Sequence, residues 1–238
     1  MGKKKVYKFS YIIPALNEEK YIGKCIESIN RQVLKPHEVI VVDNGSTDKT
    51  AAIARSLGAR VIKESKKGIA HARNSGAKAS SGNILCFIDA DSEIYSGWAA
   101  RSIFHFNRKS HAVVGLNIFT HSDLFKFLWY NTYTVIAHTY LAFNNFILGK
   151  LHLSAGNLAI KRETFLKTGG YEPYVGEDYW LSKKFWKLNL KGSFDPFMIV
   201  FSSSRGFDER GFLKTVRFWL KTTPKKADQA NYSYRSDI

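Results

Sequence analysis

The sequence is poor in cysteine and has no long, uninterrupted apolar run. Its two cysteines, Cys25 and Cys86, fall on a predicted helix and a predicted strand, which favours buried free thiols in a reducing cytosol. No cysteine and histidine residues have the spacing of a metal site. Near the start, Pro14 and the polar residues 17–19 end a short apolar stretch, so we expect no signal peptide.

Acidic residues are also scarce, with 20 Asp+Glu against 36 Lys+Arg and a formal net charge of +16. This balance favours an anionic partner, which can be a nucleotide, a nucleic acid or an anionic membrane surface. No known nucleic-acid-binding module is visible, so we expect no nucleic acid partner. With 238 residues, 45% of them hydrophobic, the chain is long enough for one domain with a full core.

The stretch that organises the sequence is an apolar run over residues 84–88, which ends in two carboxylates, Asp89 and Asp91. The run is short and rich in β-formers, so it predicts a buried strand of a parallel sheet. Ligands of such sheets bind outside the carboxyl ends of the strands, and carboxylate oxygens suit Mg²⁺ or Mn²⁺. A simple turn rich in Asp is the alternative interpretation.

Predicted strands and helices alternate along the chain, which indicates an α/β fold with a mainly parallel, doubly wound sheet. Three polar clusters each follow a predicted strand: Asn17 with Glu18, Asp43, and the Asp89–Asp91 pair. Because strand ends share one edge of a sheet, we expect these clusters to converge in one nucleotide site. The alternative is that they are separate helix caps, with Asn17 capping the first helix. Ser46 or Thr47 is expected to cap the next helix.

The same segments resemble the family 2 glycosyltransferases with the GT-A fold. Four segments match in order and spacing over roughly the first hundred residues: residues 12–19, 41–50, 68–76 and 89–91. Later segments continue the match: residues 154–160, 169–171 and 176–178. Residues 121–153 and the end of the chain fall outside it.

This resemblance implies a nucleotide-sugar donor, a divalent cation (Mg²⁺ or Mn²⁺), and a transfer that inverts the sugar carbon. It assigns the cation to Asp91 together with Asp89, which contacts either the ribose or the metal. Asp43 would accept a hydrogen bond from the base, and Arg73 would lie near the diphosphate or the base. The resemblance also places four further residues in the donor pocket: Pro14, Ala15, Asn17 and Glu18.

The acceptor side is expected at Gly156 and Asn157 and at the pair Glu177–Asp178. Glycosyl transfer needs a carboxylate that removes the proton of the acceptor hydroxyl, and Asp178 is our candidate base with Glu177 as its neighbour. The alternative role of this pair is to begin a helix, where acids suit the N-terminus. Arg205 follows a predicted strand, and its guanidinium is expected to close over the diphosphate; the alternative is a solvated loop arginine.

Residues 123–148 form an aromatic, apolar segment that polar residues interrupt. A membrane span needs roughly 20 mostly apolar residues, so we predict either an interfacial or acceptor-lining helix or a pair of core helices. Residues 210–221 predict a basic amphipathic helix that packs in the core or rests on anionic lipid. The polar residues 222–238 are expected to be poorly ordered.

These patterns predict one GT-A domain over residues 1–221, with a nucleotide-binding half over about 1–117 and an acceptor-side half over about 118–221. The expected donor is a UDP-sugar, with GDP-mannose second. The acceptor is a sugar or a lipid-linked molecule, and single transfer is favoured because no Gln-x-x-Arg-Trp motif is present. We expect a cytoplasmic protein, peripheral at the membrane. The alternatives are a metal-dependent nucleotidyltransferase and a non-catalytic nucleotide-sugar-binding protein.

Overall fold

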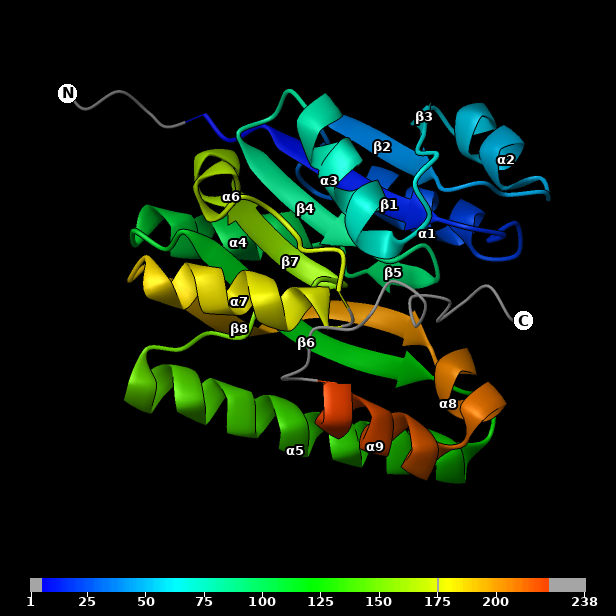
Figure 1. The fold of residues 1–238 in the computed structure, drawn as a ribbon. Coiled ribbons are helices and arrows are strands. Elements are labelled where there is room, and N and C mark those ends of the chain that lie inside the picture. Colours follow the sequence, from blue (N-terminus) through cyan, green and yellow to red (C-terminus); the bar gives the residue numbers. More distant parts are fainter. Residues whose placement is uncertain (1–5, 175, 223–238) are drawn as a thin grey trace.

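The computed structural model describes residues 6–174 and 176–222, so the tail predicted over 222–238 lies outside the described residues from residue 223 on. The described part is a single eight-stranded sheet with helices on both faces and a long helix below it (Figure 1). The strands lie in the order β3-β2-β1-β4-β7-β6-β8-β5. The predicted α/β fold is confirmed.

The elements alternate along the first half of the chain, as the pattern predicted. The strands are β1 (Phe9–Ala15), β2 (Glu38–Asp43), β3 (Arg60–Lys63), β4 (Ile84–Ile88), β5 (Ser92–Ile94), β6 (Ala112–Thr120), β7 (Asn157–Lys161) and β8 (Gly192–Ser203). The helices are α1 (Ile22–Asn30), α2 (Thr50–Ser56), α3 (Ile69–Ala79), α4 (Trp98–Asn107), α5 (Leu124–Leu148), α6 (Arg162–Thr168), α7 (Glu177–Lys187), α8 (Arg205–Arg210) and α9 (Phe212–Thr222).

Strand direction brings several chain segments to one edge of the sheet. Strands β3, β2, β1 and β4 are mutually parallel, and β6 runs parallel to β8. Strand β7 is antiparallel to both β4 and β6, so its first residue, Asn157, lies opposite Ile88 at the end of β4. The pairing of β1 with β4 stops at Ile12, so Pro14 lies beyond that ladder and its missing N–H costs no hydrogen bond to β4.

The core lies on both faces of the sheet, because successive strand residues point to opposite sides. Tyr11 and Ile13 pack in one apolar cluster with residues of α1, α2 and α4. Ile12 packs in the other, with residues of α3, α6 and α7. Helix α3 lies close to the sheet at Gly76, where an added Cβ would come within 2.4 Å of the Ile12 side chain. All five residues of β4 are buried, as the apolar run predicted.

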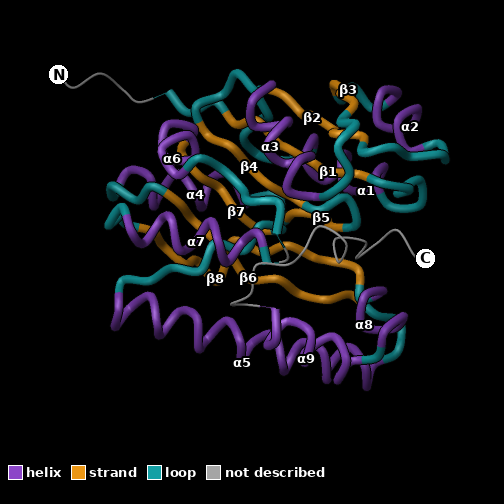
Figure 2. The backbone as a smooth tube through the Cα atoms, viewed as in Figure 1, coloured by secondary structure: helices purple, strands orange, loops and turns teal. Residues whose placement is uncertain are grey.

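The segment 123–148 is one continuous helix, α5, so the prediction of a helix pair is wrong. Its first turn is capped by Asp123, whose Oδ1 accepts a hydrogen bond from the Lys126 N–H at 2.8 Å. Gly149, at φ 63°, ends it in the left-handed conformation. Helix α5 runs along β6 and β8, and α9 lies beside it (Figures 1 and 2). Across residues 6–174 and 176–222, no helix combines the length and hydropathy that a membrane span requires.

Two of the predicted helix caps are wrong. Helix α1 begins at Ile22 rather than next to Asn17, and it has no acidic residue in its first turn. Asn17 instead adopts the left-handed conformation, at φ 55°. Helix α2 begins at Thr50, and neither Ser46 nor Thr47 caps it, because Asp48 accepts the Thr50 N–H at 2.9 Å. Asn17, Ser46 and Thr47 instead connect the loop after β1 to the loop after β2.

Candidate active site

Two loops at the carboxyl edge of the sheet are joined by hydrogen bonds. The Asn17 side-chain oxygen accepts the Thr47 N–H at 2.9 Å, and the Ser46 hydroxyl accepts the Asn17 N–H at 3.0 Å. The Thr50 hydroxyl accepts the Glu18 N–H at 2.8 Å. The loops after β1 and β2 therefore form one unit, and Asn17 tolerates the left-handed conformation that this unit requires.

Asp43 is the last residue of β2 and lies buried beneath this unit. Its Oδ1 accepts the Ser46 N–H at 2.9 Å, which fixes the turn that follows the strand. Pro14 and Ala15 lie beside it, because the register pairs Ala15 with Asp43 and Pro14 with Val42. The expected nucleotide-pocket residues of β1 and β2 are thus neighbours, and their contacts with a donor stay a prediction.

Arg205, the first residue of α8, joins the loop after β1 to the loop after β4. Its Nε donates to Asp91 Oδ2 at 3.1 Å, and a terminal nitrogen donates to Glu18 Oε1 at 2.5 Å. The guanidinium carbon also lies 4.7 Å from the centre of the Tyr21 ring. Arg205 is therefore held among acidic groups at the expected metal site, and the alternative of a solvated loop arginine is wrong.

Arg73 on α3 forms a second bridge, deeper in the molecule. Its side chain is only 3% exposed, and it donates to Asp89 Oδ1 at 2.8 Å and to Glu177 Oε1 at 2.5 Å. Burial alone would lower the pKa of the guanidinium, but the facing carboxylates of Asp89 and Glu177 raise it above its usual value. Arg73 therefore stays charged, and it connects the strand-end carboxylate Asp89 to the start of α7.

The segment before α7 is fixed to α3 by an amide that mimics backbone pairing. Asn74 Nδ2 donates to the Tyr171 carbonyl at 2.8 Å, and Asn74 Oδ1 accepts the Tyr171 N–H at 2.9 Å. Gly170 is held at φ 74°, and an added Cβ would lie 2.6 Å from Asn74 Oδ1. The buried Tyr171 ring packs 5.5 Å from the Arg73 guanidinium carbon. This contact with the Tyr171 ring helps to position the Arg73 guanidinium, which lies over the ring.

Glu177 and Asp178 are the first two residues of α7, so the prediction that they begin a helix is confirmed. Gly176 precedes them in the left-handed conformation, at φ 73°. Burial raises the pKa of Glu177; the Arg73 guanidinium partly offsets this and the neighbouring Asp178 adds to it. Asp178 Oδ1 accepts the Tyr179 N–H at 2.7 Å. Both carboxylates thus lie in the first turn of α7, at the positive end of its helix dipole.

The start of β7 lies against Asp89. An added Cβ on Gly156 would come within 2.6 Å of Asp89 Oδ2, so only glycine lets the chain approach the carboxylate this closely. Asn157 is fully buried: its Oδ1 accepts the Trp98 indole N–H at 2.8 Å and its Nδ2 donates to the Met198 carbonyl at 3.0 Å. The structure thus gives Asn157 a role in the core, and the acceptor-side role expected of it stays a prediction.

The carboxylates at the edge suit a cation that arrives with its own oxygen ligands. Among the described residues, no group of three or more His, Cys, Asp or Glu side chains is placed to hold a metal ion by itself. Asp91 and Asp89 nevertheless offer hard oxygen donors beside the loop that carries Glu18. Mg²⁺ is usually bound by one or two carboxylates plus substrate phosphates. The donor set therefore fits a divalent cation shared with a diphosphate.

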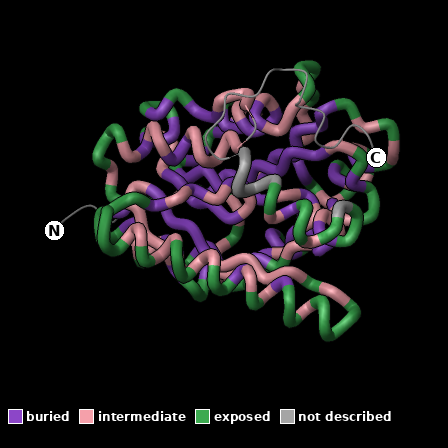
Figure 3. Tube along the Cα trace, turned by 60° about the horizontal axis from the view of Figure 1, so that its bottom comes forward, coloured by how far each residue is buried: buried purple, intermediate pink, exposed green. Residues whose placement is uncertain are grey.

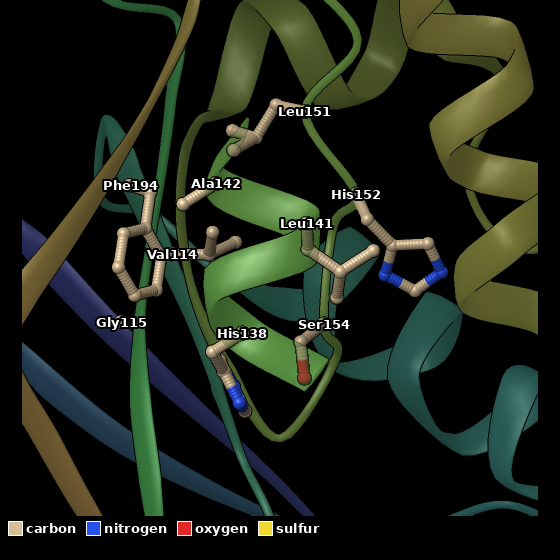
Figure 4. A pocket seen from close by; sticks show the side chains of 9 residues that line it. All are labelled: Val114, Gly115, His138, Leu141, Ala142, Leu151, His152, Ser154 and Phe194. Atoms are coloured by element: carbon tan, nitrogen blue, oxygen red, sulfur yellow. The ribbon is translucent and has the colours of Figure 1, made fainter. Parts of the chain in front are cut away.

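A small apolar hollow lies between α5 and the sheet (Figure 4). Val114, Leu141 and Phe194 line it, and His138 and Ser154 lie at one of its ends. Ser154 is two residues before Gly156, which borders Asp89. None of the bridging arginines and carboxylates lines the hollow, so it is separate from the charged edge.

The polar clusters that follow the strands thus lie together at one edge of the sheet, as predicted. Arg205 brings Glu18 and Asp91 together, and Arg73 brings Asp89 and Glu177 together. Sequence reasoning missed two supporting residues. Asn74 lies inside the matched segment 68–76, so its position next to Arg73 was an available signal, whereas nothing in the sequence pointed to Tyr21.

Comparison with known proteins gives a consistent result. The model of "Glycosyl transferase family 2" matches residues 10–169. Glycosyltransferase AglE of Haloferax volcanii is 36% identical over 117 residues, covering 46% of this chain and 38% of AglE. The PGL/p-HBAD biosynthesis glycosyltransferase of Mycobacterium bovis is 39% identical over 93 residues, covering 37% and 36%. The chain thus spans little more than a third of the length of these relatives.

Solved structures share the fold. Glucosyl-3-phosphoglycerate synthase from Mycobacterium tuberculosis superposes with a TM-score of 0.65 at 24% identity, over 93% of this chain and 80% of that one. The mannosyltransferase PcManGT from Pyrobaculum calidifontis gives 0.62 at 19% identity, over 93% and 66%. Since the family model covers residues 10–169, with every polar cluster of the first four strands inside it, the chain belongs to glycosyl transferase family 2.

Proposed function

We propose that this chain is a metal-dependent, inverting glycosyltransferase that moves a sugar from a nucleoside diphosphate to a hydroxyl group. A UDP-sugar is the favoured donor and GDP-mannose the second. Two neighbours of the same fold support the general donor class, since one is a complex with UDP and Mn²⁺ and the other a complex with GDP-Man and Mn²⁺. Because the two carry different bases, they leave the base of this chain's donor to experiment.

The observation that carries the proposal is the alternation of arginines and carboxylates at one edge of the sheet. Arg205 lies between Glu18 and Asp91, and Arg73 lies between Asp89 and Glu177. A protein that needed only stability would gain little from partly buried ion pairs, because desolvation offsets their attraction. Charges held in this way are suited to a ligand that carries both phosphates and a cation.

Arg205 is the residue of this edge best placed to contact the diphosphate. Its guanidinium offers planar donors that match phosphate oxygens, and its present partners are Glu18 and Asp91. On donor binding, we expect it to exchange the Asp91 contact for phosphate oxygens. A divalent cation held by Asp91 and Asp89 would, when bound, stabilise the negative charge that develops on the leaving diphosphate.

Asp178 is the proposed general base, which removes the proton of the acceptor hydroxyl as that oxygen attacks the sugar carbon. Its carboxylate lies in the first turn of α7, at the positive end of the helix dipole, and accepts the Tyr179 N–H. Glu177 is a positioning residue: through Arg73 it fixes the helix start relative to Asp89. The acceptor would approach from the side of Gly156, and a lipid-linked acceptor is our favoured class.

The first experiment is a thermal-shift titration with UDP, GDP, CDP and ADP, each with and without Mn²⁺ or Mg²⁺. A ligand that binds only the native state raises the melting temperature by mass action. We expect one nucleotide to bind in a metal-dependent way. Asp91→Asn should remove the metal dependence, whereas Glu163→Gln, a matched loss of charge at an exposed position on α6, should keep it.

Each outcome decides a separate part of the proposal. Metal-independent binding by the wild type would remove Asp91 from its role and leave the nucleotide site. No binding by any of the four nucleotides would contradict the transferase itself. If a nucleotide binds but Asp178→Asn transfers sugar as fast as the wild type, Asp178 is not the base, and if neither transfers, the chain is a nucleotide-sugar-binding protein.

A further inference from the structure

Helix α5 exposes large apolar side chains along its whole length. On the outer side lie Phe125, Trp129, Ile136, Tyr140, Phe143 and Ile147, which we call the outer stripe. Their exposed fractions run from 52% at Trp129 to 75% at Phe125. Figure 3 brings this side of the molecule forward, and exposed positions recur along the helix. Scattered exposed apolar residues are ordinary, but a contiguous patch of this kind marks an interaction surface.

The stripe lies on one side of the helix. At about 100° per residue, these six positions fall within roughly 60° of one another around the helix axis. The charged residue of α5, Lys126, lies outside that sector and donates to Asp208 Oδ1 at 3.0 Å. The outer stripe is therefore uncharged. Phe212 of α9 touches it at Trp129, with ring centres 5.6 Å apart, and more than half of each stripe side chain is exposed to water.

The opposite side of α5 is firmly anchored, so the stripe is not the consequence of a loose helix. Tyr130 is 5% exposed, stacks on Phe207 at 4.7 Å and donates its hydroxyl to Asp208 Oδ1 at 3.1 Å. Thr134 is buried one turn further along. Phe212 of α9 contacts the Tyr130 and Tyr133 rings. Rigid anchoring on the inner side fixes the outer stripe in one orientation.

We propose that the outer stripe of α5 docks this protein onto an anionic lipid bilayer, with the helix lying in the plane of the interface. A 25-residue helix is roughly 38 Å long and can bury its apolar side at the boundary of headgroups and acyl chains. Trp129 and Tyr140 have rings that combine an apolar body with a polar tip, which suits the headgroup layer.

The charge of the chain favours an anionic bilayer over two other partners for the outer stripe, a second copy of the chain and the chain's own residues 223–238. The chain carries a net charge of +16, which attracts an anionic surface and repels a second copy of itself. Lys150, two residues after α5, is exposed, and so are Lys214 and Arg217 on the neighbouring helix α9. Such residues near the surface add attraction to anionic lipid. The sequence 223–238 is polar, with two lysines at its start, so its composition does not suit it to cover an apolar stripe.

The outer stripe is separate from the proposed nucleotide site. It bears on the proposed function only through the acceptor. If the transferase proposal holds, binding at α5 would bring the Gly156 side of the sheet close to acceptors that are anchored in lipid. The membrane proposal itself stands on the outer stripe and the net charge alone. Nucleotide binding and vesicle binding should accordingly be lost in different variants.

The test is flotation of the purified chain with vesicles of phosphatidylcholine, alone or mixed with phosphatidylglycerol. We expect the wild type to float with the mixed vesicles and to be released by salt. Phe143→Glu should lower the vesicle partition by roughly tenfold or more, because it replaces an apolar ring that would enter the bilayer by a charge. Leu166→Glu is the matched control, since Leu166 on α6 is 56% exposed and Phe143 is 60% exposed.

A second measurement reports the contact at residue level. Cys25 and Cys86 are fully buried, so a cysteine introduced by Phe143→Cys can be labelled selectively with a polarity-sensitive fluorophore. Its emission should shift to the blue on addition of the anionic vesicles, whereas the label on Leu166→Cys should not respond. Both variants should keep the nucleotide-induced thermal shift of the wild type, which separates a failure of this proposal from a failure of the proposed function.

Three results would overturn the membrane proposal. The first is that the wild type does not float with the anionic vesicles. The second is that Phe143→Glu floats as well as the wild type. The third is that light scattering finds a dimer that Phe143→Glu dissociates and that does not bind vesicles, which would make a second copy of the chain the occupant.

Discussion

The charged edge of the sheet and the outer stripe of α5 depart from ordinary burial in opposite ways. At the edge, a guanidinium lies at 3% exposure between two carboxylates. On α5, aromatic and aliphatic side chains lie more than half exposed. Most proteins bury apolar groups and expose charges, because desolvating a charge is costly and apolar surface is driven from water. This molecule does the reverse at both places, which suggests that a partner completes each of them.

The two regions also differ in what holds them. The charged edge depends on interactions between residues far apart in the chain, such as Arg73 with Glu177 and Arg205 with Glu18. The outer stripe depends on a single helix, which is fixed by contacts on its inner side. Substitutions should therefore disturb stability at the edge and leave it unchanged on the stripe. The predictions below test that contrast, beginning with the largest expected effect.

The largest loss of stability is expected for Arg73→Met. This change keeps much of the side-chain volume but leaves Asp89 and Glu177 without their cation, and breaking a buried pair in this way costs about 3–5 kcal/mol. Urea denaturation would measure the loss. Arg31→Met is the matched control, because Arg31 faces Glu27 at 3.5 Å with both side chains more than half exposed. Equal losses in the two variants would show that the edge is not electrostatically special.

The largest loss of activity is expected for Asp178→Asn. If Asp178 is the general base, the transfer rate should fall by roughly 10²–10⁴-fold, while the free energy of unfolding changes little. Among the described residues, the Asp178 side chain accepts the Tyr179 N–H, and an amide oxygen can accept the same bond. Initial rates with saturating donor would measure the effect, and an unchanged nucleotide titration would show that the donor site is intact. A rate within threefold of the wild type would assign the proton to another group.

A smaller, pH-dependent effect is expected at Asp195 on β8. Burial would raise the pKa of Asp195, but hydrogen bonds from His105 and Arg101 outweigh it and hold the pKa at about 2. Because this pKa lies below the usual value of about 3.9, the stabilisation is present above pH 4 and is lost as the pH falls toward 2.

The variant Asp195→Asn should therefore cost about 2 kcal/mol at pH 7, after allowance for the partly exposed Arg101. Unfolding free energies of wild type and variant, measured in urea at several pH values, should converge as the pH falls below 4. A gap that stays constant over that range would mean that the loss comes from packing rather than from the charge.

The sequence predicted the framework of the site because that framework is local. The apolar run 84–88 followed by Asp89 indicates a buried strand and the edge where it ends, and the same reasoning places Asp43 at the end of β2. The helix start at Glu177 is equally local. The arginine bridges were not predictable in this way. They join residues 104 and 114 positions apart, and no periodicity indicates which guanidinium reaches which carboxylate.

Asn17 and α5 show two further limits of sequence reasoning. An Asn before an apolar stripe has the pattern of a helix cap, but here the hydrogen bond to Thr47 competes for its side chain and prevails. For α5, apolar residues occur on the inner and the outer side, so the pattern does not reveal which side meets the sheet. The pattern therefore supports an interfacial or acceptor-lining helix and a core helix pair equally.

The smallest effect on stability is expected on the outer stripe. Phe125→Ser changes the most exposed residue of the stripe, at 75%, so the free energy of unfolding should shift by less than about 0.5 kcal/mol. Phe185→Ser is the matched contrast: that ring lies on the buried side of α7 and is fully buried, so its loss should cost about 3–5 kcal/mol. Urea denaturation measures both. A large loss for Phe125→Ser would mean that the stripe is covered in solution by the chain itself or by a second copy. The contrast between the two regions would then be one of packing partners rather than of function.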